Sequence, residues 1–272
     1  MSLAGFITVT GVECAKLAAQ LKSRIVLAAC VAGPFAFAAA MRVQSSLPED
    51  TLFGRWVKES GFAIPLVVLG FAALWVFPVV TSVVGGDLFA AEDRHGTWKT
   101  LLTRSRSRSE IFLGKVVTAF GFSILAILVL AASSIAAGLL IIGDQPLVDL
   151  SGVLLPSSQA LGRVGLAWAS VLPPACGLTA LAVLLSVATR SSAAGIGLPV
   201  VIALIMQLYA LVDGPEIVRR LLITSAFGAW HGLLAEPAYY GPLVYGSATS
   251  VGVAVTCLLL AHRILQRRDI GG

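Results

Sequence analysis

The chain has 272 residues, of which 57% are hydrophobic and 12% are charged, and its mean hydropathy is +0.92. Soluble domains typically contain about 45–50% apolar residues, so this composition excludes an ordinary soluble globular protein. The net charge of +5 does not indicate a nucleic-acid partner, because the basic residues gather in the segments between long apolar runs.

Six long apolar runs follow one another along the chain. A bilayer-spanning helix needs about 17–25 mostly apolar residues, because each residue rises about 1.5 Å through a hydrocarbon core about 30 Å thick. All six runs meet this length, so we predict an all-α membrane protein with six transmembrane helices in one transmembrane permease-like domain, residues 1–272. The predicted spans are about 25–41, 62–86, 111–143, 164–189, 191–212 and 243–262.

Residues 1–24, before the first span, predict an amphipathic helix that lies on the membrane surface. Charged and apolar residues alternate over residues 6–22, which is the pattern of an interfacial helix. Because charged residues precede the first apolar run and no processing site follows it cleanly, we expect that run to be retained as a span. A simple membrane-surface anchor is the plainest function of this helix.

The most charged segment of the chain is residues 90–115, which contain six Lys/Arg and three acids. A polar helical stretch that begins at Asp87 is expected to end at Gly96, because glycine commonly ends helices. A second short helix should follow, since three apolar residues recur at the spacing of one helix face. These residues are Trp98, Leu101 and Leu102.

The third span has a sequence signal for its first residue. Ser107 and Glu110 form an S-x-x-E capping box, in which each side chain bonds a free backbone N–H of the other residue. The helix is therefore predicted to start near Ser107 and to enter the bilayer after Lys115. Residues 87–110 are expected to form a structured helical elbow between spans two and three.

The distribution of positive charge predicts which way the chain faces. The loops on the side of both termini and of the elbow carry thirteen Lys/Arg, and the opposite loops carry six. The positive-inside rule therefore places both termini and the elbow in the cytoplasm. The basic excess also predicts contact with anionic headgroups of the lipid bilayer.

Residues 213–242 form the external loop between spans five and six. The segment is amphipathic, but Arg219 and Arg220 argue against a further span. It is expected to form a helix that either lies in the outer interface or enters the membrane and returns. His231 stands beside Trp230, where an interfacial polar anchor is the plainer function and a gate or substrate contact the alternative.

The sequence lacks the residues that several classes of function require. No Asp, Glu, Lys or Arg lies deep within a predicted span, which argues against a proton-coupled carrier, an ion pump and an intramembrane protease. The four cysteines are scattered, so neither a metal site nor catalytic residues are predicted. The sequence has no G-x-x-x-x-G-K-[ST] motif, so any ATP-driven function requires a partner that binds ATP.

The segment between spans two and three resembles that of the membrane subunits of type-two ATP-binding-cassette (ABC) exporters. In that family an acid, a Gly-Thr pair, a Leu-Leu pair and a P-x-S-R motif precede a lysine at the mouth of the third span. The matching residues are Glu92, Gly96, Thr97, Leu101, Leu102, Ser107, Arg108 and Lys115. Ser105 stands in place of the usual proline, so the turn geometry is not carried over. The six-span layout and the terminal Arg267-Arg268-Asp269 extend the resemblance over the whole chain.

The resemblance implies a non-catalytic permease subunit in a bacterial plasma membrane. It implies cytoplasmic ABC ATPase subunits as partners, which bind ATP and Mg, and a second permease chain, identical or related. It also implies export of a hydrophobic or amphipathic compound such as a drug, lipid or natural product. Two alternatives without an ATPase partner remain, a six-span scaffold or assembly factor and a secondary carrier.

The resemblance also assigns roles to particular segments. It implies that the elbow couples to the ATPase, with Trp98 and the Leu-Leu pair filling a cleft on the partner, and with Glu92, Arg94 and Arg108 forming pairs at the rim. An interfacial aromatic belt is the alternative position for Trp98. Related exporters place the N-terminal helix near the ATPase. They also carry a re-entrant hairpin at the outer gate, where Phe227, Trp230 and His231 are the candidate residues here.

Overall fold

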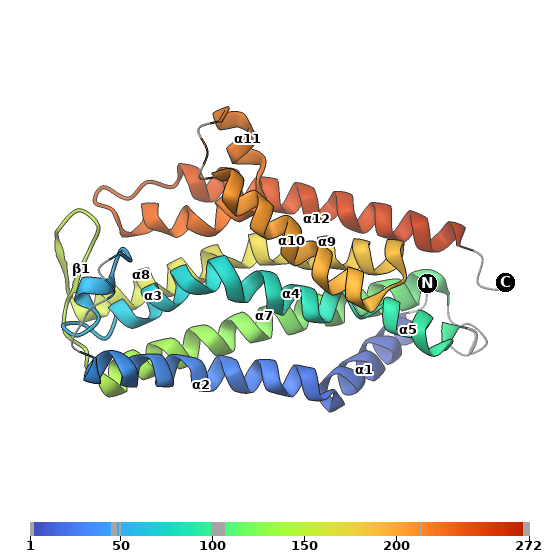
Figure 1. Ribbon diagram of the computed structural model, residues 1–272, viewed down its shortest axis with the longest axis horizontal. Helices are drawn as coiled ribbons and strands as arrows, with labels where there is room; N and C mark the ends of the chain where they lie inside the picture. The colour runs from blue at the N-terminus through green and yellow to red at the C-terminus, as the bar shows by residue number, and fades with distance from the viewer. Residues whose placement is uncertain are drawn as a thin grey trace.

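The computed structural model describes residues 3–44, 48, 50–98, 107–210, 212 and 214–268. Its long helices run along the length of an elongated bundle (Figure 1). Among the described residues, six helical segments are long and apolar enough to cross a membrane, which confirms the predicted all-α six-span fold. They are α2 (Leu21–Val43), α3–η2–α4 (Ala63–Gly85), α7 (Arg108–Ile141), α8–α9 (Ser157–Thr189), α10 (Ser192–Ala210) and α12 (Gly241–Arg267).

The second span contains a rare π-helical turn in its middle. It consists of α3 (Ala63–Phe71), the π-helical η2 (Ala72–Val76) and α4 (Phe77–Gly85). A π turn changes the pattern of backbone hydrogen bonds, and carbonyls released inside a membrane need other partners. The side-chain amide of Gln207 in α10 supplies one, since its Nε2 lies 2.9 Å from the carbonyl oxygen of Leu74.

The fourth span is broken at Val171, just before the adjacent Pro173 and Pro174. Its two parts are α8 (Ser157–Ser170) and α9 (Leu172–Thr189). Proline lacks an N–H donor and fits the first turn of a helix, so the chain restarts a helix at this point.

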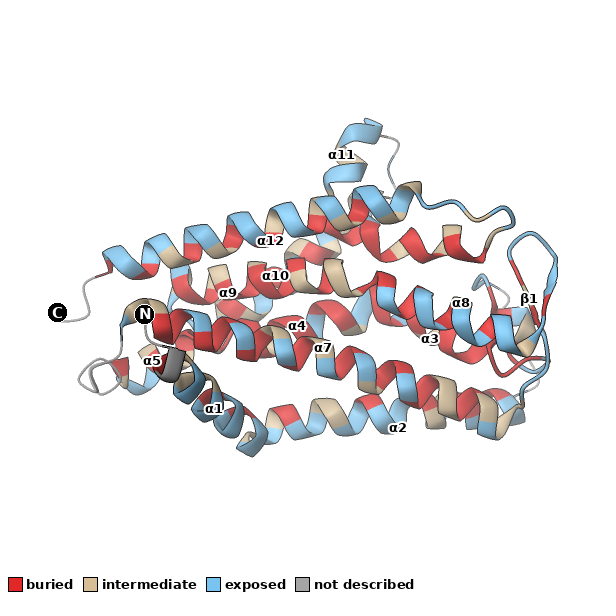
Figure 2. Ribbon diagram, turned by 180° about the vertical axis from the view of Figure 1, so that it is seen from behind, coloured by how far each residue is buried: buried red, intermediate tan, exposed pale blue. Residues whose placement is uncertain are grey.

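The middle of the bundle is formed by α4, α7 and α9, and α9 packs against α4, α7, α10 and α12. Buried residues line these central helices, whereas α2 and α12 turn exposed faces outward (Figure 2). In the most apolar window, 61% of the α8–α9 residues are buried, compared with 17% in α10. The peripheral helices α2, α10 and α12 therefore present apolar surface to whatever surrounds the chain.

The two ends of the bundle carry different elements. α1 (Leu3–Ala19), α5 (Ala90–His95) and the end of α12 lie at one end (Figure 1). At the other end, β1 (Leu147–Val148) pairs antiparallel with β2 (Leu154–Leu155), with Leu147 opposite Leu155. The short η1 (Gly54–Trp56) is followed by Ser60, whose hydroxyl donates to the carbonyl of Gln145, so η1 also lies toward this end.

The segment between α10 and α12, where an interfacial or re-entrant helix was expected, forms two helical pieces. α11 (Glu216–Leu221) projects from the bundle, and none of its described residues is buried (Figure 1). The 3₁₀-helical η3 (Ile223–Leu234) packs against α12 and α8 and buries most of its apolar residues. Leu222 separates them because its extended backbone, with ψ of 124°, cannot continue a helix. Entry of this segment into the bilayer stays a prediction.

Candidate functional site

Two local features of the elbow after the second span were predicted from the sequence: the end of its first helix and the start of α7. α5 ends at Gly96, whose φ of +64° is left-handed and therefore suits glycine. On the other side, Ser107 caps α7, because its Oγ accepts from the backbone N–H of Glu110 at 3.2 Å. The Glu110 carboxylate accepts in return from the N–H of Ser107, also at 3.2 Å, so the capping box is confirmed. Leu101 and Leu102 lie outside the described residues.

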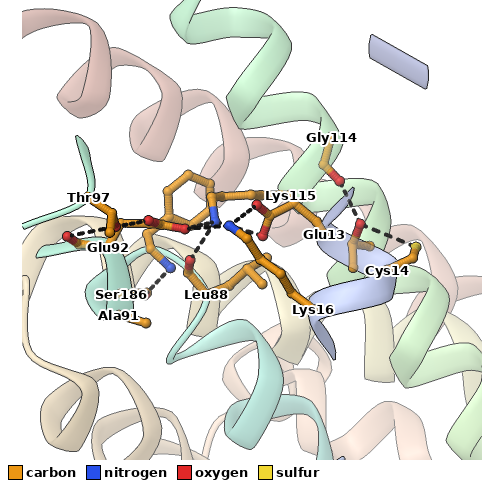
Figure 3. Close-up of polar contacts among 12 residues, drawn as sticks. Glu13, Cys14, Lys16, Leu88, Ala91, Glu92, Thr97, Gly114, Lys115 and Ser186 are labelled. Carbon is orange, nitrogen blue, oxygen red and sulfur yellow. Dashed lines mark hydrogen bonds and ion pairs between the residues drawn. The ribbon is translucent and has the colours of Figure 1, made fainter. Parts of the chain in front are cut away.

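Lys115 is the centre of a buried group of charges at this elbow. Its side chain is 1% exposed, and its Nζ donates to Glu13 Oε2 at 2.8 Å and to Glu92 Oε1 at 2.9 Å. The same ammonium donates to the backbone carbonyl of Leu88 at 3.1 Å. Lys115 therefore uses all three of its N–H donors within the chain (Figure 3).

A second lysine completes the group. Lys16 Nζ lies 2.9 Å from Glu13 Oε1 and 3.3 Å from Glu92 Oε1. We call Glu13, Lys16, Glu92 and Lys115 the buried charge cluster; it has two positive and two negative charges, and Lys16, whose side chain is 42% exposed, lies at its outer edge. Its members come from α1, α5 and α7, so it joins three elements that are far apart in sequence (Figure 3). Neutral, hydrogen-bonded groups of this kind tolerate burial, whereas a single unpaired charge does not.

The electrostatics of Glu92 follow from its neighbours. Burial alone raises the pKa of this carboxyl group, but the charge and hydrogen bond of Lys115 act in the opposite direction. The hydroxyl of Thr97 and the ammonium of Lys16 add to the lowering, and the pKa of Glu92 falls to about 2. Glu92 therefore remains ionised at physiological pH.

The elbow is also attached to the central helix α9. The backbone N–H groups of Phe89 and Ala90, at the start of α5, donate to the hydroxyl of Ser186 at 3.2 Å and 3.0 Å. Ser186 is fully buried in α9. Because the first N–H groups of a helix have no partner within it, this hydroxyl fixes the start of α5 against the bundle.

Sequence reasoning did not single out Glu13, Lys16 or Ser186 as site residues. Glu13 did carry a signal, because it lies on the same helix face as Val9 and Leu17, four residues before and after it. A carboxylate on an apolar face indicates a buried partner. Ser186 carries no such signal, since serine is common in membrane helices.

Several elbow residues expected to contact a partner are engaged within the chain. Trp98 is 4% exposed, and its ring centroid lies 6.4 Å from that of Phe89. Glu92 belongs to the buried charge cluster, and Arg108 Nη1 donates to backbone carbonyls at the end of α12. Arg94 has a side chain that is 56% exposed, and its Nη2 lies 3.8 Å from Asp87 Oδ1. The role of these residues in coupling stays a prediction. In this structure Trp98, Glu92 and Arg108 make contacts within the chain that attach the elbow to the bundle.

The three candidate gate residues lie on η3, where Phe227 and Trp230 are buried. The Phe227 ring stacks on Phe77 with centroids 5.5 Å apart, and the His231 ring lies edge-on to Trp230 at 4.1 Å. Burial lowers the pKa of His231, which favours the neutral imidazole. Their function as a gate stays a prediction.

An apolar groove of about 890 Å³ lies between α2 and the α3–η2–α4 span. Trp230 and His231 contribute to its wall, so it reaches the candidate gate. Its size falls within the range of about 300–1,000 Å³ that is typical of small-molecule sites. Other lining residues include Ile25, Ala29, Gly33, Leu74 and Trp75. In the described part of the chain, no three His, Cys, Asp or Glu side chains are grouped as a metal site requires.

Six helices long and apolar enough to cross a membrane, joined by a structured elbow, define a multi-pass membrane protein. Residues 11–206 match the family described as ABC-2 family transporter protein, and this match covers more than half of the chain. The chain therefore belongs to that family and is a membrane subunit of the ABC-2 permease type. No curated protein matches the chain. The matched region contains the elbow and the whole buried charge cluster but ends before α12.

Proposed function

We propose that this chain is the permease subunit of an ATP-driven exporter for a hydrophobic or amphipathic compound. Cytoplasmic ABC ATPase subunits bind ATP and Mg²⁺ and supply the energy, and a second permease chain completes the transport path. The proposed setting is a bacterial plasma membrane with both termini in the cytoplasm. Membership of the ABC-2 family supports a transporter subunit that works with ABC ATPases.

The buried charge cluster is the observation that supports coupling at the elbow. It joins α5 to α1 and α7, and Ser186 joins the start of α5 to α9. Removing one partner from a buried ion pair costs about 3–5 kcal/mol, so these elements resist separation. A force applied to α5 is therefore expected to move α1 and α7 together with it. The exposed side of α5, with Arg94 and His95, is where the proposed ATPase makes contact.

The test of this proposal is a pull-down from native membranes in a mild detergent. We expect the wild-type chain to capture an ABC ATPase stoichiometrically and an Arg94→Glu/His95→Glu variant to capture much less, because two negative charges replace Arg94 and His95 at the exposed contact. The matched control is Lys58→Glu, an exposed charge reversal after η1, which should capture as much as the wild type. If neither the wild type nor the control captures an ATPase, the scaffold alternative is the better explanation.

The apolar groove supports the proposed class of substrate. Its walls are almost entirely apolar, and the π turn η2 and the aromatic Trp230 contribute to them. In a transporter, such a site binds a compound by burial of apolar area, worth about 25 cal/mol per Å². None of the described residues that line the groove is an Asp, Glu, Lys or Arg, which favours an apolar or amphipathic compound over an ion.

Filling the groove is expected to reduce binding of an apolar probe while the fold is retained. A Cβ on Gly33 in α2 meets nothing within 4 Å, so Gly33→Leu places its side chain in the groove without a clash. Photolabelling by a diazirine-bearing alkyl alcohol should fall about tenfold, the loss expected when about 50 Å² of apolar contact is blocked. Gly121→Leu is the control, because Gly121 also has open space but does not line the groove. Equal labelling of both variants would count against the groove as the substrate site.

A further inference from the structure

The end of the last span is held by an arginine from another helix. Arg108 Nη1, from the first turn of α7, donates to the carbonyl oxygens of Leu265 at 3.2 Å, Gln266 at 2.9 Å and Arg268 at 2.7 Å. The last carbonyls of a helix have no partner within it and carry the negative end of the helix dipole. A guanidinium therefore complements this end in both hydrogen bonding and charge. Gln266 Nε2 adds a bond of 3.1 Å to Ser109 Oγ.

The residue that follows α12 reaches back to the elbow. Arg268 Nη1 donates to Asp93 Oδ2 at 2.9 Å, and its Nη2 bonds the other oxygen of the same carboxylate. The guanidinium carbon also lies 5.6 Å from the ring centroid of Trp98, a cation–π distance. Arg268 is only 9% exposed, whereas its neighbour Arg267 is exposed. Bidentate arginine–carboxylate pairs combine energy with a fixed orientation.

α5 is thus held from two sides. Glu92 joins it to α1 and α7, and Asp93, the next residue, joins it to the end of α12. We propose that Arg108 and Arg268 form a clamp through which the last span positions the elbow, so that Arg268 is a positioning residue for coupling. The clamp extends the elbow's contacts to α12, which lies beyond the region matched to the family. Its effect on transport rests on the proposed function, but its effect on the position of α5 does not.

The first experiment tests the clamp in the purified full-length chain, without any ATPase. The amide protons of Gly96 and Thr97 bond the carbonyls of Asp93 and Glu92, so their hydrogen exchange reports opening of α5. In Arg268→Ala we expect this exchange to accelerate by at least about tenfold, because Asp93 loses its buried partner. Asp93→Asn should give a similar change, and combining the two should add little. Arg268→Lys, which keeps the positive charge, should lie between the wild type and Arg268→Ala.

The matched control is Arg267→Ala, which removes an exposed guanidinium one residue away and should leave the exchange unchanged. Equal exchange in Arg268→Ala and Arg267→Ala would overturn the clamp. So would full additivity of Arg268→Ala and Asp93→Asn, since independent residues do not form a pair.

The second experiment tests the consequence for coupling in the complex that co-purifies with the ATPase. With the clamp removed by Arg268→Ala, we expect the ATPase to remain bound but the stimulation of its ATP hydrolysis by the alkyl alcohol probe to fall several-fold. Arg268→Lys should restore part of the stimulation, and Arg267→Ala should match the wild type. Unchanged stimulation in Arg268→Ala would overturn the positioning role even if α5 opens. Failure of the wild type to bind an ATPase would instead contradict the proposed function and leave the exchange result standing.

Discussion

Replacing Lys115 with methionine is expected to lower the free energy of unfolding by about 3–5 kcal/mol, the cost of removing one partner from a buried charge pair. The variant leaves Glu13 and Glu92 buried with Lys16 as their remaining cation in the cluster. Methionine fills a similar volume, so the loss reflects charge rather than a cavity. The measurement is equilibrium unfolding of the purified chain in mild detergent with increasing denaturant.

Two further variants separate the charge effect from a general loss of lysine. Lys58→Met removes an exposed lysine outside the cluster and should change the unfolding free energy by no more than about 0.5 kcal/mol. Adding Glu92→Gln to Lys115→Met removes the one negative charge left without a compensating cation, so part of the stability should return. A loss in Lys115→Met no larger than that in Lys58→Met would show that the cluster does not stabilise the elbow.

The same cluster predicts how stability depends on pH. The pKa of Glu92 lies at about 2 in the folded chain, below its ordinary value of 4.5. A carboxyl group whose pKa falls on folding stabilises the protein above its unfolded pKa, and that stability is lost as the pH falls toward the folded pKa. The contribution of Glu92 should therefore be constant above about pH 5 and decline between about pH 4.5 and 2. In Lys115→Met, burial acts on Glu92 without its largest opposing partner, so the folded pKa should rise toward the unfolded value and the decline of stability below about pH 4.5 should be smaller.

The elbow illustrates what the sequence can predict. The helix end at Gly96 and the capping box of Ser107 and Glu110 each depend on residues within one turn, and both were confirmed. The six spans could also be predicted from the sequence, because a span is recognised by the apolar composition of about 20 consecutive residues. Their ends were less so: α12 continues to Arg267 rather than ending near 262, because polar residues outside the bilayer extend a helix without any apolar signal.

The buried charge cluster shows why the rest was not predicted. Glu13 and Lys115 are separated by 102 residues, and no local pattern indicates that their side chains meet. Lys115 was expected at the mouth of the third span, but the sequence does not reveal its almost complete burial. The partners of Arg108 and Arg268 are likewise set by how α7 and α12 pack. Residues that the resemblance assigned to a partner interface can therefore be engaged within the chain.

The contact between α4 and α10 leads to a second prediction with a large effect. Gly86 and Gly195 bring the end of α4 and the start of α10 so close that their backbones touch. A Cβ on Gly195 would lie 2.2 Å from the carbonyl oxygen of Gly86, and a Cβ on Gly86 would lie 2.1 Å from that of Gly195. Small residues of this kind allow close packing of membrane helices. Gly86 also precedes Asp87, which pairs with Lys22 of α2, so this contact positions the start of the elbow.

Gly195→Ala is therefore expected to lower the unfolding free energy by about 3 kcal/mol, at the upper end of overpacking effects. The atom that a methyl group meets is a backbone oxygen, which cannot rotate away as a flexible side chain does. Gly197→Ala is the matched control in the same helix, because a Cβ there meets nothing within 4 Å. It should leave stability unchanged or raise it by up to about 1 kcal/mol through helix propensity. Equal effects of the two substitutions would mean that α4 and α10 do not touch at this point. A loss confined to Gly195→Ala, accompanied by weaker capture of the ATPase, would show that helix packing next to Asp87 sets the position of the elbow.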